Sequence, residues 1–150
     1  MVANPPENMP RISPYLHYRD PGAAIKWLEK AFGLEVRFSM PDKKGSIMHA
    51  EMTYQDGVVM LGPAAPQYGN KSPLDLDGIV SQGLYIYVDD VDAHYRRAKE
   101  AGAKIQMELE DMFWGDRMYS AADLEGHHWS FAQHVKEVPP EEMQPPEEWG

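Results

Sequence analysis

His49 and Glu51 are the two residues of this 150-residue chain whose types and spacing best fit acid–base chemistry. An imidazole and a carboxylate on the same face of a strand could exchange a proton with a bound molecule. His17 is a third candidate, so we name His49, Glu51 and His17 as candidate catalytic residues. This spacing is common in strands, and the pair alone does not establish an enzyme.

The same side chains together with His128 could also hold a metal ion, because two imidazoles and a carboxylate are a sufficient ligand set. The chain contains six histidines, which makes chance proximity common, and we therefore expect no such metal site. Asp89, Asp90 and Asp92 resemble ligands too, but they lie where a helix is predicted to begin, and acids stabilise that end of a helix.

The elements that must position these residues occur twice in the chain. The segment 15–20 and the helical stretch that ends at Gly33 are echoed by segment 85–90 and a helical stretch that ends at Gly102. The turn Asp56-Gly57 and the apolar run after it recur 69 residues later, from Glu125. Such a repeat predicts a pseudo-symmetric domain, with a ligand site in the cleft between the copies.

Each copy has the pattern of a βαβββ unit. Apolar residues at helical spacing follow Asp20-Pro21, which is typical of a helix start, and the strands show alternation or short apolar runs between turn residues. We predict an α+β fold with two tandem βαβββ modules, which form a curved, cup-shaped, eight-stranded mixed sheet with helices on its outer face. The predicted strands span about 12–19, 34–40, 46–54, 58–61, 84–88, 104–109, 118–122 and 127–134.

The ends of the chain have the composition of tails. Seven of the 13 prolines lie in residues 1–10 and 139–150, where they would break helix or strand bonding. We predict a flexible N-terminal tail over 1–10, a single domain over 11–136 and an acidic, proline-rich tail over 137–150. Within the domain, module one spans about 11–62, a linker about 63–81 and module two about 82–136. Trp149 leaves open a partner-binding role for the last segment.

One stretch of the chain is similar to a known family. The runs Trp114-Gly115-Asp116-Arg117 and Asp123-Leu124-Glu125-Gly126-His127, with Trp129, resemble the vicinal oxygen chelate superfamily. That group contains glyoxalases, extradiol dioxygenases and bleomycin-resistance proteins. The resemblance covers about residues 11–134 and implies the paired-module fold. It also implies a homodimer, with cups that lie within one chain or are shared by module exchange.

The resemblance further implies where a metal would bind. Enzymes of this superfamily hold a divalent ion through one His, Gln or Glu from each of four strands, and the matching positions here are Ser13, Met60, Gly83 and Ser130. A thioether, two hydroxyls and a hydrogen do not hold such an ion tightly. We therefore expect no metal and no other cofactor.

Alternation along the strands predicts which side chains face the cup. Leu84, Ile86 and Val88 suit the face under a helix, which sends Tyr85 and Tyr87 to the cup. An aromatic and histidine-rich cup with an acid suits flat or cationic organic molecules. The predicted ligand-binding residues are Tyr15, His17, His49, Glu51, Met60, Tyr85, Tyr87, Trp114, Arg117, Tyr119 and His128.

Charge and composition narrow the function further. A net charge of -10 argues against nucleic-acid binding, and the chain has neither an apolar run long enough to span a membrane nor a cysteine, so we expect a cytoplasmic protein. We predict a metal-independent protein that binds a small molecule. The alternatives are a lyase, isomerase or dioxygenase-like enzyme that uses the same cup, and an interaction protein that binds through its acidic tail.

Overall fold

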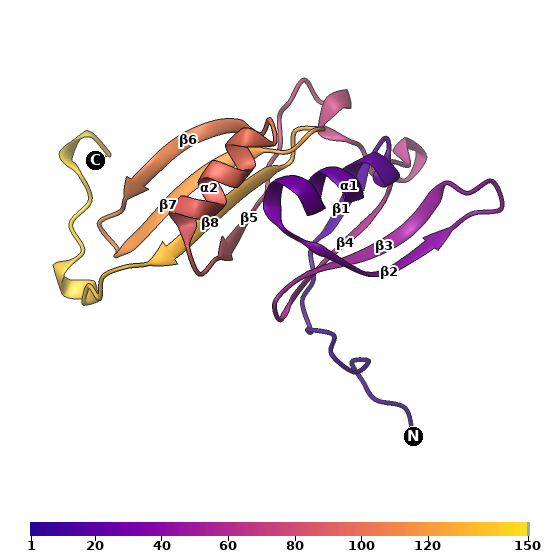
Figure 1. Cartoon of the computed structure of the whole chain (residues 1–150), viewed down its shortest axis with the longest axis horizontal. Coiled ribbons are helices and arrows are strands. Elements are labelled where there is room, and N and C mark those ends of the chain that lie inside the picture. The colour runs from indigo at the N-terminus through magenta and orange to yellow at the C-terminus, as the bar shows by residue number, and fades with distance from the viewer. Residues whose placement is uncertain (150) are drawn as a thin grey trace. The chain divides into compact units, whose positions relative to one another are not determined.

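Two βαβββ modules make up the folded part of the chain, as predicted (Figure 1). The computed structural model describes residues 1–149. Module one contains β1 (Tyr15–Tyr18), α1 (Pro21–Phe32), β2 (Glu35–Pro41), β3 (Ile47–Tyr54) and β4 (Gly57–Pro63). Module two contains β5 (Gly83–Tyr87), α2 (Val91–Glu100), β6 (Lys104–Asp111), β7 (Asp116–Ala122) and β8 (His128–His134).

The eight strands form two four-stranded mixed sheets of equivalent topology. Their strand orders are β1-β4-β3-β2 and β5-β8-β7-β6. In each sheet the first and last strands of the module pair in parallel, while the other neighbours pair antiparallel. Each sheet has its helix packed on one side, and we call the opposite side the open face of that module.

Local signals in the sequence account for the helix ends. The Asp20 side chain accepts a hydrogen bond from the Ala23 amide at 3.1 Å, and the Asp90 side chain accepts one from the Ala93 amide at 3.0 Å. These carboxylates cap α1 and α2, so the expectation that Asp90 caps a helix is confirmed. Gly33 ends α1 in the left-handed conformation at φ 76°.

The core of each module lies between its helix and its sheet. In module one, Leu28 and Phe32 of α1 and Met52 and Leu61 of the sheet are fully buried. In module two, the rings of Tyr119 and Phe131 stack with centroids 5.5 Å apart, and the ring of His94 from α2 lies 4.2 Å from that of Phe131. Burial of these side chains on the helix side leaves the open faces to position other groups.

The chain divides into two compact units, and these coincide with the two modules except at one short segment. Residues 124–127, which connect β7 and β8, belong with residues 1–81. The Glu125 carboxylate, 5% exposed, accepts bonds from the amides of Arg19 at 2.6 Å and Asp20 at 3.0 Å and from the Ser72 hydroxyl at 2.6 Å. This connection is therefore fastened to module one by a buried carboxylate. Among residues 1–149, no helix is both long and apolar enough to cross a membrane.

Candidate functional site

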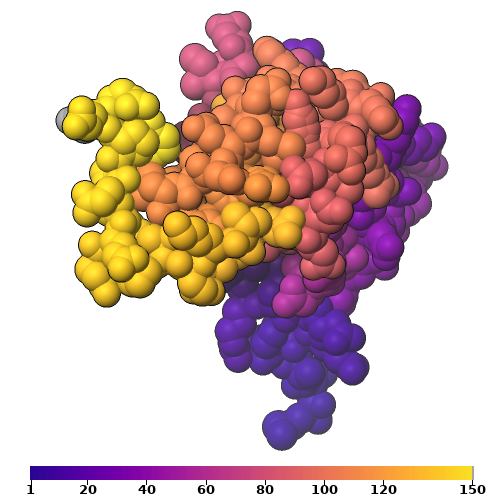
Figure 2. Space-filling view, turned by 60° about the vertical axis from the view of Figure 1, so that its left-hand side comes forward, coloured from indigo at the N-terminus to yellow at the C-terminus, as the bar shows by residue number. Residues whose placement is uncertain are grey.

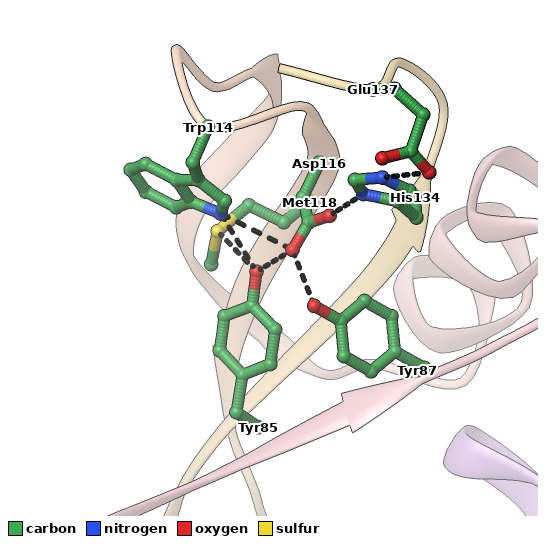
Figure 3. Close-up of polar contacts among 7 residues, drawn as sticks. All are labelled: Tyr85, Tyr87, Trp114, Asp116, Met118, His134 and Glu137. Atoms are coloured by element: carbon green, nitrogen blue, oxygen red, sulfur yellow. Dashed lines mark hydrogen bonds and ion pairs between the residues drawn. The ribbon is translucent and has the colours of Figure 1, made fainter. Parts of the chain in front are cut away.

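A buried carboxylate on the open face of module two gathers four side chains around it (Figure 3). Asp116, at the start of β7, is 1% exposed. Its Oδ2 accepts hydrogen bonds from the hydroxyls of Tyr85 at 2.6 Å and Tyr87 at 2.9 Å and from the indole Nε1 of Trp114 at 3.2 Å. Its Oδ1 lies 2.8 Å from Nδ1 of His134. We call these five residues the Asp116 cluster.

Strand register and alternation bring the cluster together. Tyr85 and Tyr87 are two residues apart on β5 and therefore point to the same face. Asp116 and His134 are register partners on β7 and β8. Between Tyr87 and Met118, β8 presents only Ala132, so small side chains leave room for the phenols to reach across the sheet.

The turn before β7 depends on a glycine. Gly115 has φ +104°, and a Cβ at this position would lie 2.0 Å from the carbonyl oxygen of Lys136. Its own carbonyl oxygen accepts bonds from the amides of Val135 at 2.9 Å and Lys136 at 3.1 Å. Glycine therefore lets the chain that follows β8 lie directly against the turn that carries Trp114.

The cluster fixes the charges of its members. Burial alone would raise the pKa of Asp116, but the hydrogen bonds from Tyr85, His134, Tyr87 and Trp114 together bring it below its usual value. Burial, with the bond to Asp116, raises the pKa of Tyr85, while that bond is the main cause of the raised pKa of Tyr87. The bond to Asp116 also raises the pKa of His134. Near neutral pH the carboxylate is therefore charged and both phenols are protonated.

Asp116 organises the rings, and the four donors around it use most of its capacity to accept hydrogen bonds. A carboxylate offers about four acceptor positions, and four donors surround this one. The rings that it holds remain accessible, since Tyr85 is 46% and Tyr87 58% exposed. Their centroids are 5.6 Å apart at an interplanar angle of 67°. Exposed rings fixed in one geometry can bind a flat organic molecule without losing much side-chain freedom.

The rest of this open face carries further polar side chains. The hydroxyls of Ser120 and Ser130 lie 2.8 Å apart, and the side-chain amide of Gln106 lies 3.0 Å from Nε2 of His128. Gly83 is the register partner of His128 on β5. This end of the sheet can offer hydrogen bonds to the polar edge of a molecule that lies on the tyrosine rings.

The open face of module one holds a second polar arrangement. The Tyr15 hydroxyl lies 3.0 Å from Nδ1 of His49, and Nε2 of His49 lies 3.1 Å from Oε2 of Glu51. Nε of Arg37 lies 3.3 Å from Oε1 of Glu51. Burial raises the pKa of Tyr15, which keeps its phenol protonated. In neutral His49, Nε2 therefore donates to Glu51 and Nδ1 accepts from Tyr15.

Further predicted residues border this arrangement. The ring of His17 lies 4.9 Å from that of Tyr15, and Met60 is the register partner of both Tyr15 and Glu51. The structure therefore gathers Tyr15, His17, His49, Glu51 and Met60 on one sheet of module one. Tyr85, Tyr87, Trp114 and His128 share the sheet and the adjoining turn of module two.

The placement of Arg117 and Tyr119 in the cup is wrong. Tyr119 is fully buried, and its hydroxyl lies 2.7 Å from Nδ1 of His94 on α2. Arg117 pairs with Asp111 at 2.7 Å and with Asp92 of α2 at 3.2 Å. Both side chains therefore lie on the helix side of β7. Alternation puts Asp116 and Met118 on the open face instead.

Sequence reasoning missed Asp116 and His134 as site residues. Asp116 stands in the Trp-Gly-Asp run, but β7 is buried on both faces, so the sequence pattern does not show which side this residue faces. His134 has no comparable signal, because its role comes from a register partner 18 positions away.

The residues present do not fit the metal that enzymes of the resembled family hold. Of the four matching positions, Ser130 is bonded to another serine, Met60 offers a thioether and Gly83 has no side chain. Within residues 1–149, no three His, Cys, Asp or Glu side chains gather into a set that could hold a metal ion. His49 and Glu51 contact each other, but within residues 1–149 no third His, Cys, Asp or Glu joins them to complete a metal site.

A groove of about 480 Å³ lies on the helix side of module two, between α2 and β6. The Tyr95 hydroxyl in this groove donates to the Glu108 carboxylate and accepts a hydrogen bond from Lys99 at 3.3 Å. These polar groups are engaged with one another, so the open faces are the better candidate site. The groove is lined by Asp92, Tyr95, Arg96, Lys99, Glu100, Glu108 and Leu109.

Comparison with known proteins agrees with this architecture. Protein Rv0887c of Mycobacterium tuberculosis is 40% identical over 138 residues, which cover 90% of this chain and 81% of that protein. The crystal structure of TioX from Micromonospora sp. ML1 has a TM-score of 0.70 and 32% identity, and the match covers 84% of this chain and 99% of TioX.

A more distant structure shares the fold. TnmS3 from Streptomyces sp. CB03234, described as an antibiotic binding protein, has a TM-score of 0.63 and 20% identity over 84% of this chain and 99% of its own. Residues 12–131 match the family model described as Glyoxalase/Bleomycin resistance protein/Dioxygenase superfamily. The chain belongs to this superfamily.

Proposed function

We propose that this protein binds a flat organic molecule on the open face of module two and sequesters it without chemical change and without a metal. The observation that carries the proposal is the Asp116 cluster, in which one buried carboxylate holds the exposed rings of Tyr85 and Tyr87 in place. Rings held in advance lose little freedom when a ligand stacks on them. The negative net charge and the aromatic faces favour a ligand that is also cationic.

Relatives give this proposal a precedent. TnmS3 is described as an antibiotic binding protein, and its likeness to this chain extends to the fold. The absence of suitable donors at Ser13, Met60, Gly83 and Ser130 supports a role that needs no metal.

The proposal is tested by titrating the full chain, after treatment with a chelator, with proflavine, a planar cation of three fused rings. We expect binding that is independent of added divalent ions and recovery of unchanged dye. Tyr87→Ala should weaken binding about ten-fold or more, since stacking on one ring is worth about 1–3 kcal/mol. Tyr68→Ala, which removes an exposed ring 79% accessible in the linker, is the matched control and should bind normally. Binding that requires a metal, or chemical conversion of the ligand, would contradict the proposal.

A second candidate function is acid–base catalysis on the open face of module one. The observation that favours it is the run of contacts from Tyr15 through His49 to Glu51, because a hydroxyl, a base and a group that orients the base are the parts of a proton relay. Tyr15 would take a proton from a bound substrate while its own hydroxyl proton passes to Nδ1 of His49, and Glu51 would stabilise the imidazolium that forms. For any activity found, Glu51→Gln and Tyr15→Phe should each lower kcat while the fold is retained. Unchanged kcat in both variants would exclude this role.

We also propose that the protein forms a homodimer. β2 and β6 are edge strands, and every residue of β2 is exposed, including the apolar side chains of Phe38 and Met40. Exposed edges with apolar side chains are sites of strand pairing between chains. Native mass spectrometry should show two chains per particle, and a monomer across the micromolar range would refute this proposal.

A further inference from the structure

We propose that Trp149 is a ligand-contacting residue of the site in module two and that it selects planar molecules with several fused rings. This inference rests on the proposed function, since it adds a wall to the same site. The C-terminal segment lies along the edge of module two, as the yellow and orange surfaces in Figure 2 show. The feature that carries the inference is the contact between the ring of Trp149 and the turn that holds Trp114.

Ring contacts and one hydrogen bond link the aromatic side chains from Tyr87 to Trp149 in a series. Tyr87 and Tyr85 are 5.6 Å apart by centroid, and Nε1 of Trp114 lies 3.4 Å from the Tyr85 hydroxyl. Trp114 and Phe113 are in edge contact at 5.0 Å, and Phe113 and Trp149 at 5.6 Å. The aromatic surface that begins on β5 therefore extends onto the C-terminal segment.

The start of this segment is fastened at the site. The amides of Val135 and Lys136 donate to the carbonyl oxygen of Gly115, one residue after Trp114. Nε2 of His134 lies 3.2 Å from a carboxylate oxygen of Glu137. Four prolines, at positions 139, 140, 145 and 146, then restrict the backbone between this anchor and Trp149. The segment is therefore held at its start and stiffened on the way to the ring.

The two indoles at the end of the series have the spacing of a clamp that is nearly open. The centroids of Trp114 and Trp149 are 6.4 Å apart, with an interplanar angle of 54°. A planar ring between two others needs centroids roughly 7 Å apart, because carbon atoms make contact at about 3.5 Å. A shift of Trp149 by about an ångström and a rotation would admit one ring system. Trp149 is 55% exposed, so little packing opposes this movement.

This arrangement favours size rather than charge. A molecule with one ring is covered by Tyr85 and Tyr87 alone, whereas three fused rings reach from the tyrosines toward Trp114 and Trp149. The glutamates beside Trp149 add attraction for any cation, and they do so without regard to the number of rings.

The experiment compares proflavine with benzamidine, a cation with a single ring, on the full chain, on three variants of the C-terminal segment and on the variants Tyr87→Ala and Tyr68→Ala. Trp149→Ala and truncation after Glu137 should each lower proflavine affinity about ten-fold, which corresponds to the loss of one aromatic contact. Trp149→Phe should retain most of the affinity, and benzamidine binding should not change in Trp149→Ala or Trp149→Phe, whereas the truncation, which also removes the glutamates, should weaken the binding of both cations through lost charge. Tyr68→Ala again serves as the matched control.

The outcomes separate this inference from the proposed function. Proflavine binding that is unchanged or tighter in Trp149→Ala, but weaker in Tyr87→Ala, would overturn the role of Trp149 and leave the proposed site intact. Proflavine binding that is absent, or that neither variant alters, would overturn both. A readout without ligand is the nuclear Overhauser effect between the ring protons of Trp149 and Phe113, whose absence would also overturn the inference.

Discussion

Gly62 lies directly beneath the phenol of Tyr15, and a Cβ at this position would be 2.5 Å from the Tyr15 hydroxyl. The residue on β4 therefore decides whether Tyr15 on β1 can reach His49 on β3. The overlapping atom would be the hydroxyl oxygen at the end of the Tyr15 side chain, and this side chain can rotate away from a new methyl group.

Replacing Gly62 with alanine should displace Tyr15 with little loss of stability. We expect the free energy of unfolding to fall by about 1 kcal/mol and the bond between Tyr15 and Nδ1 of His49 to be lost. The ¹⁵N chemical shifts of the His49 ring report this bond. Gly57→Ala is the control, since its Cβ would make only an ordinary contact of 3.5 Å. A His49 spectrum unchanged by Gly62→Ala would contradict the close approach.

Replacing Asp116 with asparagine should weaken both module two and its ligand binding. The amide keeps the shape but loses the charge, and its NH₂ group would face a donor. We expect unfolding to become easier by about 2–3 kcal/mol, as for the loss of bonds to a buried charged group. The control is Asp111→Asn, an exposed partner of Arg117, which should cost below about 1 kcal/mol. Equal effects of the two changes would show that the Asp116 cluster does not stabilise the module.

Stability should depend on pH through Asp116 and His134. The folded pKa of His134 lies above its ordinary value of 6.5, so its contribution is complete below pH 6.5 and is lost as the pH rises through the folded value. The folded pKa of Asp116 lies below 3.8, so its contribution is complete above pH 3.8 and is lost as the pH falls through the folded value. Thermal unfolding from pH 3 to pH 9 should therefore show the largest contribution of this pair between these limits.

The variant His134→Gln tests the part of this pH dependence above pH 6.5, where the contribution of His134 is lost. It should lower the melting temperature at pH 6 and have a smaller effect at pH 9, because the contribution of the charged imidazole is lost as the pH rises through its raised folded pKa. A constant difference across this range would rule out a charged partnership between His134 and Asp116.

Replacing Gly115 with alanine should be among the most damaging single-methyl changes in module two. The new Cβ would overlap the backbone oxygen of Lys136, which cannot move without the chain that follows β8. We expect a loss of about 3 kcal/mol or more, with steric overlap added to the cost of positive φ. Gly102→Ala, at φ +92° with no atom near its Cβ, should show the backbone cost alone, about 1–2 kcal/mol. Urea unfolding of both variants measures the difference.

The fold could be predicted because its signals are local. Capping acids, terminating glycines and alternation each lie within a few residues of the element that they specify, and the repeat shows them twice. The sequence places Tyr85 and Tyr87 on the open face because Leu84, which precedes them on β5, and Ile86, which lies between them, suit only the helix side.

The site could be predicted only in part, for two physical reasons. β7 is buried on both faces, so its hydrophobicity does not show which residues lie under α2, and the predicted placement of Arg117 and Tyr119 on the cup side is wrong for this reason. The bonds of Asp116 join residues 29, 31 and 18 positions apart, and such contacts follow from register, which short sequence patterns do not specify.

The buried carboxylate of Glu125 makes the two copies of the repeat interdependent. A fragment cut at the linker would contain the amides of Arg19 and Asp20 and the hydroxyl of Ser72, yet lack the acceptor that all three share. The other fragment would carry a loop with nothing to receive it. A gene split between the repeats would therefore yield halves that must be produced together, although each half encodes a complete sheet and helix.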